Sequence, residues 1–438
     1  MRKEKERLEN MQDWIDKYVK MNTTIMPFSK PLYVMTKPVG AVCNLACDYC
    51  YYLEKLNLYK DTSKYVMSDE LLERFIKEYI SSQTMPQVLF TWHGGETLMR
   101  PLSFYKRAVE LQKQYAEGRT IDNCIQTNGT LLTDEWCQFF KENNWLVGVS
   151  IDGPQEFHDE YRRNKQGLPS FVKVMRGIEL LDKHGVEWNA MAVVNDYNAD
   201  YPVEFYNFFK SMGCHYIQFA PIVERIFKHD DGRHLASPMQ AGDKLADFSV
   251  TPEQWGNFLC KLFDEWVKND VGEYFIQIFD STLANWVGEQ PGVCSMAKTC
   301  GHAGVMEFNG DVYSCDHYVP HRTKSGSPET HLRTVRPDTL PFAVCAPSEA
   351  HPALDSGHSQ AVWIYTAGYA VSAPPLHCHS DRWPGVLHLH GWRKFVSASQ
   401  CAEFPVSAAA PLPIAVQTFA VLLWLLTVAQ HAPAWALA

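Results

Sequence analysis

Cys43, Cys47 and Cys50 form a C-x3-C-x2-C pattern directly after an apolar run of the chain. Iron–sulfur clusters are held by soft thiolates, and a cluster of four irons normally takes four of them. Three thiolates would leave one iron open to a further ligand. A zinc site usually takes four ligands from paired spacings, and no fourth ligand is adjacent here. The spacing therefore predicts a [4Fe-4S] cluster with one exchangeable position.

The 13 cysteines of the chain fall into two groups and several single positions. In a large cytosolic chain, grouped cysteines more often bind a metal or act in catalysis than form disulfides. The second group is Cys294, Cys300 and Cys315, and Asp316 follows its last member. Single cysteines in apolar surroundings are interpreted as small buried hydrophobes. These are Cys124, Cys137, Cys214 and Cys260.

Between about residues 30 and 225, short β-rich apolar runs alternate with longer amphipathic runs. This alternation is typical of an α/β fold in which βα units repeat around a parallel sheet. Helices are expected at 68–82, where Ser68 can cap the start, and at 133–141 and 171–184. Six strands are expected, at Tyr33–Val39, Val88–Trp92, Ile121–Gln126, Leu146–Ile151, Trp188–Val194 and Tyr216–Ala220.

Such a series closes into a full or partial barrel, whose active site lies at the carboxyl ends of the strands. The first cysteine group follows the first expected strand, so it falls at that end. The run His93-Gly94-Gly95-Glu96-Thr97 follows the second. Two glycines let a ligand approach the backbone and leave carbonyl oxygens to accept from an ammonium group. An ordinary tight turn is the alternative interpretation of this pair.

Residues 252–287 are expected to form two further helices, the first opened by Thr251-Pro252 as cap and first-turn proline. A β-hairpin is expected next, because Asn309-Gly310 joins two apolar runs and both residues tolerate positive φ. The hairpin would bring Cys315 back towards Cys300. We divide the chain into an N-terminal helical extension (1–30), a barrel (31–250), a small region with the hairpin (251–319) and a tail (320–438).

Composition restricts the class of partner and the compartment. The formal net charge is -10, and no basic stretch is dense enough to follow a phosphate backbone, so nucleic acid is not expected as a partner. Residues 1–20 are charged throughout and contain no apolar run of the kind that a secretory signal needs. We expect a cytoplasmic protein.

The tail differs in composition from the rest of the chain. Residues 320–438 carry 13 charged side chains and 13 of the 25 prolines. The apolar run at 413–429 is shorter than the usual membrane span of about 20 residues and has no persuasive flank, so membrane insertion is not expected. One hypothesis is that the tail is translated out of frame, and resequencing around codon 320 tests it.

The first cysteine group, with the aromatic Tyr49 before its last member, resembles the radical S-adenosylmethionine (SAM) superfamily. The resemblance extends through the βα region and implies a partial (β/α)6 barrel. It implies that the open iron of the [4Fe-4S] cluster binds the amino and carboxylate groups of SAM. An electron from the cluster then breaks a carbon–sulfur bond of SAM, and the hard chemistry belongs to these cofactors.

Several phrases resemble the anaerobic sulfatase-maturating enzymes, a subfamily with auxiliary clusters. They are QTNGTLL at 126–132, VGVSIDGP at 147–154, HDEYR at 158–162 and CGHAGVMEFNGDVYSCDHY at 300–318. The resemblance implies oxidation of a cysteine or serine of a sulfatase to Cα-formylglycine. It implies an unfolded or nascent sulfatase as the partner, an electron donor such as flavodoxin or ferredoxin, and no membrane or nucleic acid.

The resemblance also assigns roles to individual residues. It places Tyr49, Gly95, Ser150, Arg162 and Val223 at the contacts with SAM. Independently of the resemblance, Ser150 is expected to end a strand and Arg162 to lie in the polar loop after it, so both can face a ribose or carboxylate. The alternatives are a turn cap for Ser150, a surface cation for Arg162 and simple packing for Val223.

By the same resemblance, Cys294, Cys300 and Cys315 are ligands of an auxiliary [4Fe-4S] cluster, and Asp316 is the general base. The 5′-deoxyadenosyl radical would remove a hydrogen from the target Cβ, Asp316 would take the thiol or hydroxyl proton, and the auxiliary cluster would accept an electron. A carboxylate serves as base when it is within hydrogen-bond reach and partly desolvated. Asp280 is a second, weaker candidate for that role.

The chain departs from the family after Asp316. Family members continue with a cysteine-rich stretch that completes the first auxiliary cluster and supplies a second. This chain offers only Cys345, Cys378 and Cys401, each more than twenty residues from the next. By the resemblance, the first auxiliary cluster is then left with three thiolates and the second with none.

Two alternative functions follow. One is a different radical SAM peptide-modifying enzyme, such as a thioether-forming maturase, which peptide product analysis would distinguish. The other is an inactive iron–sulfur or zinc protein that binds metal without cleaving SAM. A tRNA-modifying enzyme is disfavoured, because no basic region accompanies the cysteines.

Overall fold

The computed structural model describes residues 33–56, 65–227, 235, 244–286, 289, 291–293, 296–297, 303–313 and 315–316, and two strands at 363–366 and 369–372. The expected N-terminal helical extension, Cys294, Cys300 and the apolar run at 413–429 lie outside these residues. So do Cys345, Cys378 and Cys401.

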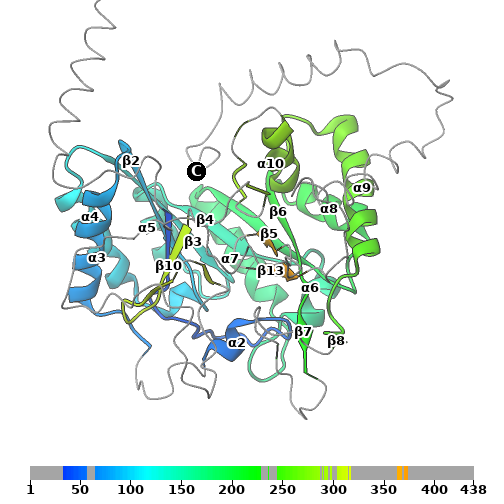
Figure 1. Cartoon of the computed structure of the whole chain (residues 1–438), viewed down its shortest axis with the longest axis horizontal. Helices are drawn as coiled ribbons and strands as arrows, with labels where there is room; N and C mark the ends of the chain where they lie inside the picture. Colours follow the sequence, from blue (N-terminus) through cyan, green and yellow to red (C-terminus); the bar gives the residue numbers. More distant parts are fainter. Residues whose placement is uncertain are drawn as a thin grey trace, which may run out of the picture.

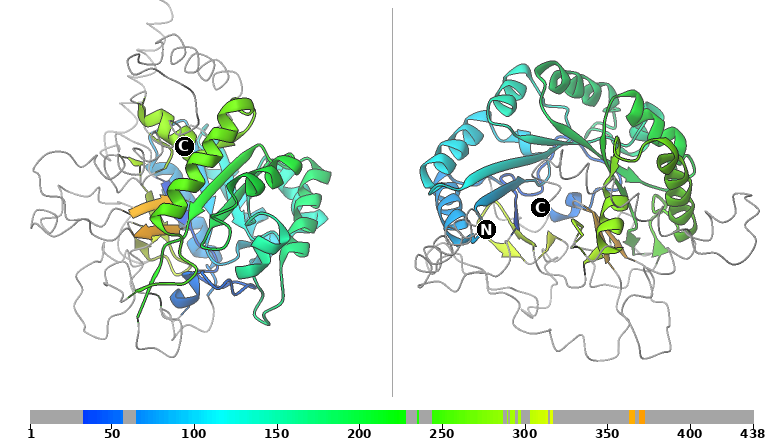
Figure 2. Two further views of the ribbon diagram at one scale, coloured as in Figure 1. Left: turned by 90° about the vertical axis from the view of Figure 1, so that its right-hand side faces the viewer. Right: turned by 90° about the horizontal axis from the view of Figure 1, so that it is seen from above.

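The centre of the molecule is a curved sheet of parallel strands. All six expected strands are present. They are β1 (Tyr33–Thr36), β2 (Gln87–Trp92), β3 (Thr120–Thr127), β4 (Leu146–Ser150), β5 (Trp188–Val194) and β6 (Tyr216–Pro221). Each pairs in parallel with its neighbour in sequence. The α/β fold with a partial barrel is thereby confirmed, and Figure 2 shows the helices along the outer face of the sheet.

Helices α3 and α9 begin at residues whose side chains cap their first turns. Ser68 accepts from the backbone N–H of Leu71 and caps α3, as expected. Thr251 and Gln254 form a reciprocal capping box at α9, with Pro252 in the first turn. The helices are α2 (Tyr52–Lys55), α3 (Asp69–Ser82), the short 3-10 helix η1 (Thr97–Met99), α4 (Leu102–Tyr115), α5 (Asp134–Glu142), α6 (Gln155–Tyr161), α7 (Phe171–His184), α8 (Pro202–Ser211), α9 (Pro252–Asn269) and α10 (Gln277–Trp286).

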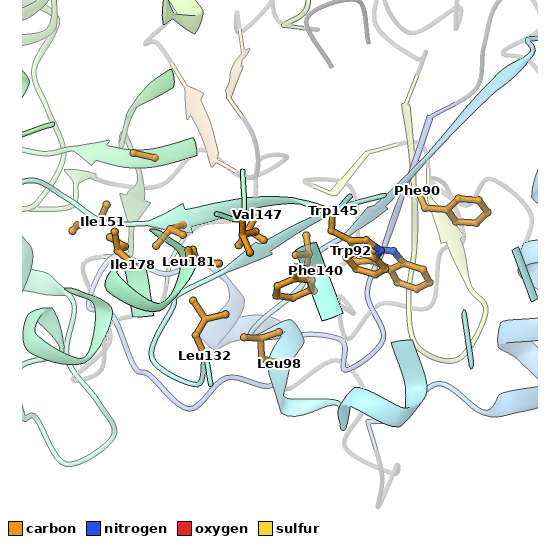
Figure 3. Packing of buried hydrophobic residues seen from close by; sticks show 14 of the residues in the cluster. Phe90, Trp92, Leu98, Leu132, Phe140, Trp145, Val147, Ile151, Ile178 and Leu181 are labelled. Carbon is orange, nitrogen blue, oxygen red and sulfur yellow. The ribbon is translucent and has the colours of Figure 1, made fainter. Parts of the chain in front are cut away.

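An aromatic core fixes the sheet against its helices. Trp92 on β2 and Trp145, just before β4, stack with ring centroids 6.3 Å apart. Both indoles are fully buried, and Figure 3 shows them beside Phe90 and Phe140. Large aromatic rings bury extensive apolar area and stack with defined geometry. This core therefore supports the sheet from behind, away from the strand ends that carry the polar residues.

Residues after 250 extend the same sheet at both edges. β10 (Ala303–Met306) pairs in parallel with β1, and β11 (Val312–Tyr313) pairs antiparallel with β10. β9 (Phe275–Ile276) adds to β6 at the other edge. The strand order is β11-β10-β1-β2-β3-β4-β5-β6-β9, and Figure 1 labels β10 alongside the first strands. The expected hairpin therefore closes against the start of the barrel.

The loop of this hairpin contains both Asn309 and Gly310. Met306 pairs with Val312, so five residues connect the strands, and only Gly310, at φ 89°, has a positive φ. Asn309 instead closes the loop by accepting from the backbone N–H of Asp311 at 3.1 Å. The expected hairpin is thus present, with a connecting loop longer than two residues.

Two short antiparallel pairs lie outside the main sheet. β7 (Arg225–Ile226) pairs with β8 (Lys244–Leu245). In the tail, β12 (Trp363–Thr366) pairs with β13 (Tyr369–Ser372). Among the described residues, no helix combines the length and apolar character needed to cross a membrane.

Candidate active site

The loop that carries the first three cysteines lies at the carboxyl end of β1. Its backbone is fixed to the segment that follows α6, because Ala46 N–H donates to Arg163 O at 2.8 Å and Asp48 N–H to Tyr161 O at 3.0 Å. Cys47 is buried, and Cys43 and Cys50 are half-buried. The loop is thus a supported part of the barrel.

The three thiols lie within electrostatic reach of one another. Burial is the largest cause that raises the pKa of Cys43, Cys47 and Cys50, in each case to about 12. A neighbouring thiolate raises each pKa further, while the Arg162 guanidinium lowers those of Cys47 and Cys50. These mutual charge interactions show that the three sulfur atoms lie near one another, as the thiolate ligands of one iron–sulfur cluster must.

A site for a single metal ion would need several ligand side chains close together. Within the described ranges, no three Cys, His, Asp or Glu side chains converge as they would around one metal ion.

Amide groups surround the sulfur of Cys43. The backbone N–H of Leu45 lies 3.3 Å from Cys43 Sγ, and Asn128 Nδ2 lies 3.7 Å from it. Asn128 Nδ2 also donates to Asn44 Oδ1 at 2.8 Å, and Asn44 donates to Thr130 Oγ1 at 2.9 Å. Donors to cluster sulfurs tune the reduction potential of iron–sulfur centres. Asn128 and Leu45 are in position for that role.

Glu96, at the carboxyl end of β2, ties this amide group to the sheet. Its carboxylate accepts from the backbone N–H of Asn128 at 2.7 Å, from Thr127 Oγ1 at 2.7 Å and from the backbone N–H of Leu98 at 2.9 Å. Burial raises the pKa of Glu96, and these hydrogen bonds oppose the rise. The ends of β2 and β3 are therefore joined through one buried carboxyl group.

Gly95 is required by the packing of the chain against itself. A Cβ atom there would lie 2.1 Å from the carbonyl oxygen of Val42 and 2.5 Å from that of Ala41. Its N–H donates to Gly40 O at 2.8 Å. The sequence argument attributed the glycine pair to the approach of a ligand, whereas the close neighbours of Gly95 are the backbone atoms of the cysteine loop.

Tyr49, Arg162 and Ser150 all lie at the carboxyl ends of β4 and β5. Asp152, two residues after Ser150, is fully buried and accepts from Tyr49 OH, and it also accepts from Arg162 Nε at 2.8 Å and Nη2 at 3.0 Å. Arg162 is 3% exposed, so it is not a surface cation. Ser150 accepts from Gln126 Nε2 at 3.0 Å. Val223, after β6, is partly buried and packs on the main core.

Asp316 is the centre of a second buried polar group. Its carboxylate accepts from Tyr52 OH at 2.6 Å and from Tyr51 OH. Lys55 Nζ donates to its Oδ1 at 2.7 Å, and Lys37 Nζ forms a second ion pair with Oδ1. Lys37 also pairs with Glu307 at 2.9 Å. Two buried ammonium groups are thus balanced by two buried carboxylates.

Charge balance determines the protonation of this group. Burial alone would raise the pKa of Asp316, but Lys37 and Lys55 more than offset it and hold that pKa well below its usual value. Burial lowers the pKa of Lys55 to about 8, against the opposing effect of Asp316. For Lys37, the two carboxylates outweigh burial and raise the pKa. Asp316 is therefore an ionised carboxylate.

Sequence reasoning named only part of this site. The structure brings Cys43, Cys47, Cys50, Tyr49, Gly95, Ser150, Arg162 and Asp316 to the carboxyl ends of the strands. Sequence reasoning did not identify Asp152, Asn128, Lys37, Lys55 or Tyr52 as part of the site. It also did not predict that Glu96 connects the ends of β2 and β3. A polar residue directly after a buried strand is the signal that would have found Lys37, Asp152 and Asn128.

The other acidic candidate lies elsewhere. Asp280 belongs to α10, and burial raises its pKa to about 7. Its charge contributes, after burial and Glu187, to raising the pKa of Tyr216, the first residue of β6. Asp280 is thus close to the amino end of that strand, opposite the cysteine loop. Cys315 is half-buried beside Asp316.

Comparison with known proteins agrees with this arrangement. The model of the Radical SAM superfamily matches residues 38–209. The chain is 81% identical over 306 residues to the serine-type anaerobic sulfatase-maturating enzyme of Bacteroides thetaiotaomicron, a match that covers 70% of this chain and 74% of that protein. It is 34% identical to the cysteine-type enzyme of Clostridium novyi, over 68% of this chain and 76% of that protein.

A solved structure matches in the same range. The structure of anSMEcpe with bound AdoMet and the Cp18Cys peptide is 32% identical, with a TM-score of 0.56, over 66% of this chain and 76% of that chain. The partial coverage fits the prediction that the tail departs from the family.

Proposed function

This chain belongs to the anaerobic sulfatase-maturating enzymes of the radical SAM superfamily, and we propose that it oxidises a cysteine or serine of a sulfatase to Cα-formylglycine. Its cofactors are a [4Fe-4S] cluster and SAM. The ligands proposed for the cluster are Cys43, Cys47 and Cys50. The contacts proposed for SAM are Tyr49, Gly95, Ser150, Arg162 and Val223.

One observation supports this function above the others. Tyr51 and Tyr52 directly follow the last cysteine of the loop, and both hydroxyls donate to Asp316. The segment that supplies the cluster ligands therefore also contacts the proposed base. A proton acceptor and a hydrogen-abstracting cofactor must act on neighbouring atoms of one residue, so this proximity is what oxidation of a side-chain –CH2OH or –CH2SH group requires.

The reaction removes one hydrogen atom from Cβ, one proton from the hydroxyl or thiol, and one further electron. Bound at these residues, the cofactors would supply the radical that takes the hydrogen atom and the acceptor for the electron. Asp316 would take the proton at a carboxylate oxygen. The proposed auxiliary ligands are Cys294, Cys300 and Cys315. A serine gives the aldehyde directly, whereas the thioaldehyde formed from a cysteine is hydrolysed.

The surroundings of Asp316 keep its carboxylate ionised before the substrate arrives, which a base requires, while the same positive charges reduce its proton affinity. Lys37 and Lys55 keep the carboxylate charged in a site where it is fully buried. After Asp316 accepts a proton, the two lysines and Glu307 carry a net positive charge. Because burial lowers the pKa of Lys55 to about 8, that ammonium group is the one placed to release a proton and restore neutrality.

The proposed partners are a sulfatase polypeptide and a protein electron donor such as flavodoxin or ferredoxin, with the cytoplasm as the compartment. The relatives named above include a serine-type enzyme at 81% identity and a cysteine-type enzyme at 34%. We therefore expect the serine substrate to be accepted, and the experiment includes both substrates.

Mass spectrometry of a sulfatase-type peptide tests the function. Reconstituted protein, SAM and a strong reductant are incubated anaerobically with serine and cysteine versions of the peptide. Loss of two hydrogen atoms from the serine peptide, or exchange of the cysteine thiol for an aldehyde, is the expected result. If 5′-deoxyadenosine forms while both peptides stay unchanged, this chain cleaves SAM without maturing sulfatases. A thioether product would instead indicate another peptide-modifying enzyme.

A further inference from the structure

The Asp152 carboxylate accepts four hydrogen bonds from three residues in different parts of the barrel, Tyr49, Arg162 and Val193. Its Oδ2 accepts from Tyr49 OH and from Arg162 Nε at 2.8 Å. Its Oδ1 accepts from Arg162 Nη2 at 3.0 Å and from the backbone N–H of Val193, at the end of β5, at 2.8 Å. The side chain is fully buried, so these donors are what compensates the charge.

The arrangement fixes the planes of two side chains. A carboxylate that engages Nε and Nη2 together holds the guanidinium in one orientation, because both groups are planar forks. Arg162 Cζ lies 5.5 Å from the centre of the Tyr49 ring, which is itself 0% exposed. Tyr49 is anchored to the same carboxylate through its hydroxyl. Asp152 thus determines where both groups lie relative to the cysteine loop.

We propose that Asp152 is a positioning residue for SAM, which holds Arg162 and Tyr49 in the orientation in which they would contact the cofactor. This inference rests on the proposed function in one respect, because it takes those two residues as SAM contacts. A carboxylate that only joined β4 to β5 would need the Val193 N–H alone. The bidentate pair with Arg162 and the hydrogen bond from Tyr49 go beyond that need, and the positioning role accounts for them.

Asp152→Asn tests the proposal with minimal change in shape. In one orientation the amide Nδ2 faces Arg162 Nη2 and the Val193 N–H, and in the other it faces Arg162 Nε and the Tyr49 hydroxyl, which can turn to accept. At least one hydrogen bond from Arg162 is therefore lost in either orientation. SAM binding is measured by anaerobic equilibrium dialysis on cluster-reconstituted protein without peptide. The dissociation constant for SAM is expected to rise about tenfold, the scale of a charge-assisted hydrogen bond. An unchanged dissociation constant would overturn the proposal.

A double-mutant cycle with Arg162→Ala separates positioning from general support. If Asp152 acts through Arg162, adding Asp152→Asn to the Arg162→Ala protein changes the dissociation constant by less than about twofold. If the two effects multiply in full, Asp152 acts independently of Arg162 and the proposal fails. Iron content and the circular dichroism melting curve are recorded for each variant, because a purely structural role would move those and leave SAM binding per intact cluster unchanged.

Asp159→Asn is the matched control. Asp159 lies on α6, between Asp152 and Arg162 in the sequence, and its carboxylate accepts from the backbone N–H groups of Ser170 and Phe171 at the start of α7. The same charge is removed there without touching Arg162 or Tyr49, so SAM binding should match that of the parent.

A second variant keeps the test decisive if Asp152→Asn does not fold. Tyr49→Phe removes only the hydroxyl that donates to Asp152, and weaker SAM binding supports the proposal whereas parental binding refutes it. Parent protein that binds SAM but leaves the sulfatase peptide unchanged would refute the proposed function and leave this inference intact.

Discussion

Lys55, in the short helix α2, donates from Nζ to both the carboxylate and the main-chain oxygen of Asp316, at 2.7 and 2.5 Å. The two residues are 261 positions apart in the chain. The contact therefore joins the segment after the cysteine loop to the segment after the hairpin. A lysine that accompanies a buried carboxylate in this way affects both its charge and its location.

Removal of Lys37 should destabilise the protein strongly. Lys37→Met leaves Glu307 buried without its cation and Asp316 with one cation instead of two. Loss of one partner from a buried ion pair typically costs about 3 kcal/mol of unfolding free energy. Anaerobic urea denaturation followed by circular dichroism measures it. Lys106→Met, which breaks an exposed pair with Glu135, should cost less than about 1 kcal/mol.

His158 should make stability depend on pH. Burial, followed by the charge of Arg162, lowers the pKa of His158 to about 3. Its Nδ1 accepts from the backbone N–H of Asp152 at 3.3 Å, and Nε2 is 2.9 Å from Ser170 Oγ, so the neutral ring uses both nitrogens. Unfolded chains bind a proton here below about pH 6.5 and the folded protein does not, so stability falls as pH drops from there towards 3.

A His158→Gln variant measures this contribution. Its unfolding free energy should fall less steeply between pH 6.5 and pH 5, by at most about 1.4 kcal/mol per pH unit for a single proton. Equal slopes for the parent and the His158 variant would contradict the prediction.

The fold was predictable because its signals are local. β1 to β6 lie where apolar β-rich runs lie, and α3 and α9 begin at residues whose side chains cap a helix. The parallel pairing of β10 with β1 was not predictable, because nothing in a four-residue strand specifies a partner 270 residues away. The hairpin was predictable from Asn309-Gly310, but its loop length was not, because this pair suits several loop lengths.

The functional site, like the fold, was predictable only where its sequence signal is local. The cysteine spacing is a local pattern and predicts a ligand set. The ion pairs of Asp316 with Lys37 and Lys55 depend on where distant segments meet, and single lysines in a sequence usually lie at the surface. Gly95 was named as a contact for SAM, which stays a prediction; the close packing that requires a glycine there is formed by the backbone of the cysteine loop.

Gly95→Ala should disrupt the cysteine loop. The added Cβ would lie 2.1 Å from Val42 O, a backbone atom that cannot turn aside as a side chain can. We expect lower iron content after reconstitution and a lower melting temperature. Gly256→Ala in α9 has no atom within 4 Å of the added Cβ and should be neutral or stabilising by up to about 1 kcal/mol. Parental iron content in Gly95→Ala would show that the loop can move aside.

Asn128→Leu should lower the reduction potential of the cluster. The substitution removes the amide that lies 3.7 Å from Cys43 Sγ, and donors near cluster sulfurs stabilise the reduced, more negative state. A redox titration monitored by electron paramagnetic resonance gives the potential. Asn143→Leu is the control, because Asn143 Nδ2 donates to Phe139 O at 2.9 Å, at the end of α5. Equal potentials in the parent and Asn128→Leu would exclude this role for the amide.

Asp316→Asn should separate SAM cleavage from product formation. The amide cannot accept the substrate proton as a carboxylate does, so formylglycine formation should fall by roughly 10²- to 10⁴-fold, the usual contribution of a general base. 5′-Deoxyadenosine should still form, because Asp316 is not among the proposed SAM contacts. Asp311→Asn, in the loop of the same hairpin, should retain parental rates, since Asp311 pairs only locally with Asn309 at 2.8 Å. Product formation at the parental rate in Asp316→Asn would remove Asp316 as the base, and the proton would then have to leave through another group.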